Sequence, residues 1–79
     1  MDYLLKAKEI LSSSLSIPID QISNDDLIEQ INPAVDSVNF ATLVMETERF
    51  LQKEVPVTEW LELASVHDLA AILQRNHRN

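Results

Sequence analysis

The chain has 79 residues, 46% of them apolar, and its 13 acidic and 6 basic side chains give a formal net charge of −7. This length allows one small domain, predicted to span residues 1–79, and the apolar content is too high for a disordered segment. The negative charge disfavours nucleic acid and anionic membranes as partners and favours proteins with basic patches. The lack of cysteine excludes disulfides and thiol catalysis by the protein itself.

Helical spacing of apolar residues opens the chain, with Asp2 as the predicted N-cap. Serines and then Pro18 end this helix, because serine is a weak helix former and proline cannot continue one. A long connection over residues 16–35 follows, and its many isoleucines and leucines predict a loop pinned to the core, with one helical turn. The predicted apolar stripe of the first helix comprises Tyr3, Leu4, Ala7, Ile10, Leu11 and Leu15.

A second helix is predicted over residues 37–52. At about 100° per residue its apolar side chains separate into two groups. The broad group, Phe40, Leu43, Val44, Phe50 and Leu51, is predicted to face the core, with Thr47 in its middle. The narrow group, which we call the α-strip, consists of Val38, Ala41 and Met45 and falls on the opposite side. An apolar strip with charged neighbours such as Glu48 is typical of a transient docking site, unless the long connection covers it.

The sequence "EVPV" ends the second helix, and Thr58 is the predicted cap of a short helix in "EWLEL". Ser65 and Asp68 have the spacing of a capping box and predict the start of a last helix. The fold class is therefore all-α, with four helices, a long first loop and a short third helix. The predicted core comprises Leu4, Leu11, Leu15, Phe40, Leu43, Val44, Phe50, Leu69 and Leu73.

Ser37 stands at the start of the second helix, where unpaired backbone N–H groups and the helix dipole favour an anion such as a phosphate ester. An Asp-Ser pair at a helix start is also an ordinary cap. The surrounding sequence "VDSVNFATLVMETERF" resembles the D-S-L-x-x-x-x-L-V-M-x-x-E segment of acyl carrier proteins. The resemblance covers nearly the whole chain, including the "VP" before the short helix and the closing "ASVHDLAAIL".

The resemblance implies a four-helix acyl-carrier-like bundle that carries acyl or aminoacyl groups as thioesters on a phosphopantetheine arm. It implies that Ser37 is the attachment site and that Asp36 contributes to its recognition. It also implies docking of partner enzymes at the α-strip, with the acids Glu46 and Glu48 beside it. The implied partners are a phosphopantetheinyl transferase and the enzymes that load, transfer or condense acyl groups in a fatty acid, polyketide or nonribosomal type of pathway.

Some residues differ from the family pattern. Ala34 follows Pro33 where the family usually has glycine two residues before the Asp, and Asn39, Thr42 and Arg49 replace acids that are common in fatty-acid carriers. Trp60 is unusual in the short helix. These differences indicate a specialised carrier with partners of its own.

The sequence bears on three other functions. A serine hydrolase is disfavoured because the histidines, His67 and His77, belong to the last helix and its end, and because the chain has no glycine for an oxyanion hole. His67 is expected at the surface and His77 in a frayed end. The acids near residues 20–26 lack the spacing of a calcium loop, so no metal is expected. A carrier-like interaction module that is never phosphopantetheinylated remains the main alternative.

No apolar run is long enough to cross a bilayer, and the start "MDYLLKAKEI" lacks a cationic leader. We therefore expect a cytoplasmic carrier, and we expect it to be a monomer. The starting Met and the absence of linkers favour a free-standing chain, with a domain excised from a larger synthase as the alternative.

Overall fold

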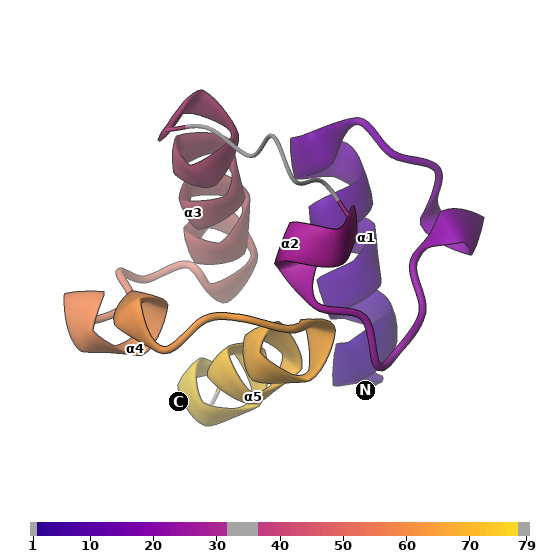
Figure 1. Cartoon of the computed structure of the whole chain (residues 1–79). Helices are drawn as coiled ribbons and strands as arrows, with labels where there is room; N and C mark the ends of the chain where they lie inside the picture. Colours follow the sequence, from indigo (N-terminus) through magenta and orange to yellow (C-terminus); the bar gives the residue numbers. More distant parts are fainter. Residues whose placement is uncertain (1, 32–36, 78–79) are drawn as a thin grey trace.

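A computed structural model describes residues 2–31 and 37–77 of the chain (Figure 1). The elements are α1 (Tyr3–Leu15), a 3₁₀ turn η1 (Ile19–Gln21), α2 (Ile28–Ile31), α3 (Ser37–Leu51), α4 (Val57–Leu61) and α5 (Val66–Asn76). Within the described ranges the only strand-like pairing is an isolated bridge between Leu27 and Ser65. The predicted all-α fold is confirmed, with α1, α3, α4 and α5 as the four expected helices and α2 as the helical turn in the first loop.

Both ends of helix α1 are capped by neighbouring residues of the chain. The Asp2 carboxylate accepts a hydrogen bond from the Leu5 backbone N–H at 3.0 Å, as the sequence predicts for an N-cap. At the other end Ser16 adopts a left-handed conformation with φ 57°, and the Ile17 N–H donates to the Ser12 carbonyl. This left-handed ending brings the backbone N–H groups of Ser16 and Ile17 to the Ser12 carbonyl, in a chain that has no glycine to offer there.

The core lies where α1 and α5 pack together and α3 covers them. The buried apolar residues come from α1, α3, α4 and α5, from the first loop and from the α3–α4 connection: Ala7, Ile10, Leu11, Leu15, Ile22, Leu43, Leu51, Val55, Trp60, Val66, Leu69, Ala70, Ile72 and Leu73. Of the predicted core, Leu11, Leu15, Leu43, Leu69 and Leu73 are buried, while Leu4, Val44 and Phe50 pack against the core with partial exposure.

The first loop is attached to the core as predicted, and its anchors are both apolar and backbone groups. Ile22 is buried, and the loop hydrogen-bonds to the segment before α5: Ile28 N–H donates to the Ala64 carbonyl at 2.9 Å, and Val66 N–H donates to the Asp26 carbonyl at 3.0 Å. These bonds satisfy loop backbone groups that packing removes from water.

Phe40 is an exception to the predicted core face of α3. It is 39% exposed, because its ring lies at the edge of the bundle, edge-to-face with the indole of Trp60 at 6.0 Å between centroids. The prediction that Phe40 is a core residue is therefore wrong. Trp60, from the short helix α4, occupies the interior instead, with 9% exposure.

Helix α4 begins at Val57, two residues earlier than predicted, and Thr58 is not its cap. Pro56 stands at the N-cap position and no side chain caps the helix. Proline already has the backbone angle that a helix start requires, and it contributes no N–H that would need a partner.

Helix α5 starts at the predicted capping box, in which Ser65 and Asp68 each accept a hydrogen bond from the other's backbone N–H.

His77, at the end of α5, is packed and not frayed as expected. Its ring stacks on Phe50 at 4.9 Å, and its Nδ1 is hydrogen-bonded to the Tyr3 hydroxyl at 3.0 Å. The ring thus joins the end of α5 to the beginning of α1 and the end of α3. No helix in the described parts is both long and apolar enough to span a membrane.

Candidate functional site

Ser37 is the first residue of α3 and is exposed. At the start of a helix the first backbone N–H groups have no partner within the helix, so the region around the Ser37 hydroxyl favours negative charge. The hydroxyl is accessible to an enzyme and lies where a phosphate ester would be stabilised. Asp36, the predicted recognition residue, lies outside the described residues.

The first turns of α3 are held in place by polar side chains. Asn39 Nδ2 donates to the Ser14 carbonyl at 3.4 Å, which joins the start of α3 to the end of α1. The Thr42 hydroxyl donates to the Val38 carbonyl at 3.0 Å, one turn earlier on the same helix. Ser37 is thus presented from a helix end that is fixed to the bundle, although the side chain itself is in solvent.

The α-strip lies on the outside of the bundle. Val38 is 70% exposed, Met45 is 59% exposed, and Ala41 between them is exposed as well. The described part of the long connection does not cover them. The predicted exposure of this strip is confirmed, and the strip begins one residue after Ser37.

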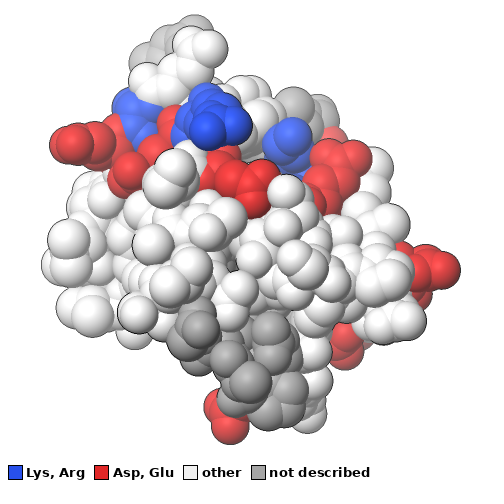
Figure 2. All heavy atoms as spheres, turned by 90° about the horizontal axis from the view of Figure 1, so that it is seen from above, with Lys and Arg blue, Asp and Glu red and all other residues white. Residues whose placement is uncertain are grey.

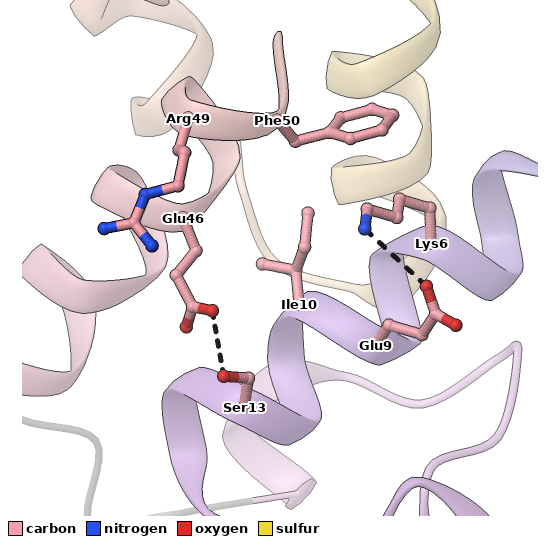
Figure 3. A pocket seen from close by; sticks show the side chains of 7 residues that line it. All are labelled: Lys6, Glu9, Ile10, Ser13, Glu46, Arg49 and Phe50. Atoms are coloured by element: carbon pink, nitrogen blue, oxygen red, sulfur yellow. Dashed lines mark hydrogen bonds and ion pairs between the residues drawn. The ribbon is translucent and has the colours of Figure 1, made fainter. Parts of the chain in front are cut away.

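The Glu46 side chain points toward α1 and away from the α-strip. Its carboxylate accepts hydrogen bonds from the Ser13 hydroxyl at 2.8 Å and the Ser14 hydroxyl at 2.9 Å, both on α1. Figure 3 shows this side chain at an open hollow of about 320 Å³ between α1 and α3, where Arg49 and Phe50 also lie. Glu46 therefore connects two helices, and the structure does not place it with the α-strip.

Glu48 is nearer to the strip, but its carboxylate also has a structural partner. Its Oε2 accepts a hydrogen bond from the Val55 backbone N–H at 2.8 Å. Val55 is buried in the connection between α3 and α4, where its N–H would otherwise lack a partner. Both acids expected beside the docking strip thus take part in holding the fold together.

Charge is unevenly distributed over the face that includes the start of α3. Figure 2 shows this face from above: basic side chains lie among acidic ones along one border, and a broad neighbouring area carries neither.

Helix α4 adds exposed apolar residues that the sequence interpretation missed. Val57 is 71% exposed and Leu61 is 79% exposed, and they are one turn apart on the same short helix. Val57 and Leu61 are four residues apart in "VTEWL" and so lie on one face of the helix, whereas Trp60 lies on another; this spacing could have predicted their exposure. The same helix thus directs one large side chain inward and two outward.

Neither histidine is bonded to Ser37. His67 Nε2 lies 3.0 Å from the Asp25 carboxylate, and His77 is held by Tyr3. Among the described side chains, no group of three or more potential metal ligands comes together. The surroundings of Ser37 offer an accessible hydroxyl, a helix end and an apolar strip.

A family model described as the phosphopantetheine attachment site matches residues 6–73. The chain belongs to this family, that of the acyl carrier proteins. Comparison with curated protein sequences finds no significant match. The cofactor of this carrier domain is accordingly covalent phosphopantetheine, and domains of this kind are generally carriers and not catalysts. The exposed serine hydroxyl at the start of α3 fits a group attached as a phosphate ester.

Proposed function

We propose that this acyl carrier domain bears its phosphopantetheine arm on the Ser37 hydroxyl and presents acyl or aminoacyl intermediates to successive enzymes. The observation that carries the proposal is an exposed hydroxyl on the first residue of α3, in a chain that belongs to the phosphopantetheine-attachment family. When bound, the arm supplies a thiol that holds the acyl group as a thioester. Asp36, as the preceding residue, is proposed to contribute to recognition by the transferase.

The helix end contributes to holding the attached group. A phosphate on Ser37 lies beside the partly positive N-terminus of α3, a position that stabilises an anion by about 0.3–1 kcal/mol. The bond between Asn39 and Ser14 keeps this end against α1, so the orientation of the helix dipole is fixed before the arm is attached. The chain positions the arm and performs no bond chemistry on the acyl group.

Partner enzymes are proposed to dock on the α-strip. Val38 and Met45 are mostly in solvent and belong to the helix that bears Ser37, so a partner that covers them has the arm directly beside it. A small apolar patch gives the weak, rapidly exchanging contact that a carrier visiting several enzymes needs. The partners are a phosphopantetheinyl transferase and the enzymes that load and transfer acyl groups in a fatty acid, polyketide or nonribosomal type of pathway.

Intact-mass measurement after incubation with coenzyme A, magnesium and a permissive transferase tests the attachment site. The wild-type chain is expected to gain the mass of one arm, and Ser37→Ala is expected to gain none. Ser23→Ala is the matched control, because Ser23 is also exposed but lies in the first loop, and it should load as the wild type does. Loading of Ser37→Ala at another residue would refute the assignment. Failure of the wild type to load with several transferases would favour an unmodified interaction module.

A further inference from the structure

The indole N–H of Trp60 is buried without a hydrogen-bond partner. Nε1 is out of contact with solvent, and it meets no acceptor in the part of the chain that the structure describes. Buried tryptophans usually bond this N–H, because leaving a buried donor unpaired costs about 1–3 kcal/mol. The interior of the domain therefore contains a donor that can bond an acceptor from outside the chain.

This donor lies close to the start of α3. The Trp60 ring contacts the ring of Phe40 edge-to-face, and Phe40 is one helical turn after Ser37, about 4.5 Å along the helix axis. Phe40 is partly exposed, so one ring separates the indole from the surface beside Ser37. A flexible chain attached to the Ser37 hydroxyl has only this short distance to cover.

Helix α4 is held by few anchors. Of its apolar side chains only Trp60 is buried, since Val57 and Leu61 point into solvent. Its other attachment to the bundle is Glu59, whose carboxylate accepts hydrogen bonds from Arg75 and Asn76 of α5 at 2.8 Å each. A helix of five residues with one buried ring and one bound carboxylate can shift locally at low cost in free energy. Such a shift would give a chain attached to Ser37 access to the indole, whose ring meets that of Phe40.

We propose that Trp60 Nε1 donates a hydrogen bond to a carbonyl oxygen of the loaded arm when the arm folds back between α3 and α4. This inference rests on the proposed attachment at Ser37. The acceptor is a carbonyl from one of two sources, an amide of the arm or the thioester of the acyl group. The bond satisfies the unpaired donor, so the folded-back state is favoured by the chain itself and not only by burial of the acyl group.

The experiment uses the single tryptophan of the chain, which gives one indole N–H signal in a ¹⁵N-labelled sample. Loading is first verified by intact mass. The indole signal is then compared in four forms: the unloaded chain, the arm with a free thiol, a butyryl thioester, and an S-butyl thioether that lacks the thioester carbonyl. A downfield shift in all three loaded forms identifies an amide acceptor. A downfield shift with the butyryl thioester alone identifies the thioester carbonyl.

Two variants provide a second measurement. Loading is expected to raise the wild-type melting temperature by about 4–8 °C, the shift that one hydrogen bond of average net strength gives a domain of this size. Trp60→Phe keeps an aromatic ring, removes the donor and should lose this rise. Leu61→Gln changes an exposed side chain of the same helix and should keep it.

An indole signal that stays unchanged in all loaded forms overturns the inference. A signal that moves equally with the butyryl thioester and the S-butyl thioether, but not with the arm alone, also overturns it, because the alkyl chain would then be the cause. These outcomes are observed on the folded wild type and do not depend on the stability of Trp60→Phe. A wild type that does not load refutes the proposed function instead, and intact mass distinguishes the two failures.

Discussion

Thr47 offers a test of the core that is independent of any partner. It is fully buried in the middle of the core face of α3, and its hydroxyl oxygen has no hydrogen-bond partner among the described residues. Thr47→Val exchanges this hydroxyl for a methyl group of nearly the same shape. Both residues are β-branched and have similar helix propensity, so the exchange changes little else in the helix.

The expected gain follows from the unpaired hydroxyl. Burying a hydroxyl without a partner costs about 1–3 kcal/mol in proteins, and the valine methyl group removes that cost. For a domain of this size 1 kcal/mol corresponds to about 4–8 °C in melting temperature. We therefore expect Thr47→Val to melt at least about 4 °C above the wild type. Loading at Ser37 should be unchanged, because Thr47 lies on the face opposite the α-strip.

Thermal and urea unfolding measure the effect, and Thr42→Val is the matched control. Thr42 is on the same helix, but its hydroxyl is partly exposed and donates to the Val38 carbonyl, so its replacement should change stability by no more than about 0.5 kcal/mol in either direction. A Thr47→Val variant that melts at or below the wild-type temperature would show that the Thr47 hydroxyl has a partner in solution, such as a buried water, and would refute the reasoning.

Three further outcomes are expected. Met45→Gln should change the free energy of unfolding by less than about 0.5 kcal/mol, because Met45 is mostly in solvent. It should nevertheless reduce kcat/KM for arm attachment about 5–30-fold, the effect of losing an apolar anchor of moderate strength. Early melting with normal loading would place Met45 in the core. Gln52→Gly should stabilise the fold by about 0.5–1 kcal/mol, because Gln52 has φ 59°, a left-handed conformation that is unfavourable for residues other than glycine. Gln74→Gly is the control: it lies within α5, where glycine should cost about 1 kcal/mol in the same urea titration. Burial raises the pKa of Glu59, but hydrogen bonds from Asn76 and Arg75 and the charge of Arg75 outweigh it, so the pKa lies below its ordinary value of 4.5. The stability that Glu59 contributes is therefore present above pH 4.5 and lost as the pH falls below it, and the difference between wild type and Glu59→Gln should shrink between pH 6 and pH 3.

The elements that the sequence predicted best depend on neighbours in the chain. The Asp2 cap and the capping box of Ser65 and Asp68 each need only residues three positions apart, so their spacing is enough. The exposure of Val38 and Met45 was predicted because helical periodicity places them opposite the broad apolar face of α3.

The errors arose where the outcome depends on a second element. Periodicity gives the direction of Phe40 on α3 but not how far α4 extends over it, and that extent decides its exposure. Glu46 is a charged residue on a surface helix, and nothing near it in sequence indicates that Ser13 and Ser14 lie opposite. His77 was expected to fray because it is close to the end of the chain, but its exposed ring is hydrogen-bonded to Tyr3 and stacked on Phe50, both distant in sequence.

The residues of α3 that hold the fold and those proposed to dock a partner lie on different faces of the helix, with one exception. Glu46 and Asn39 are hydrogen-bonded to α1, another face of α3 packs on the core, and the exposed α-strip is the part that we propose to meet a partner. If the α-strip is the docking site, substitutions in it should alter partner binding at little cost in stability, because its side chains bury little area. Glu48 is the exception: it borders the strip and also holds the backbone of Val55. A substitution there alters the α3–α4 connection as well as the charge beside the strip, so an effect of Glu48→Gln on docking counts as electrostatic only if the melting temperature is unchanged.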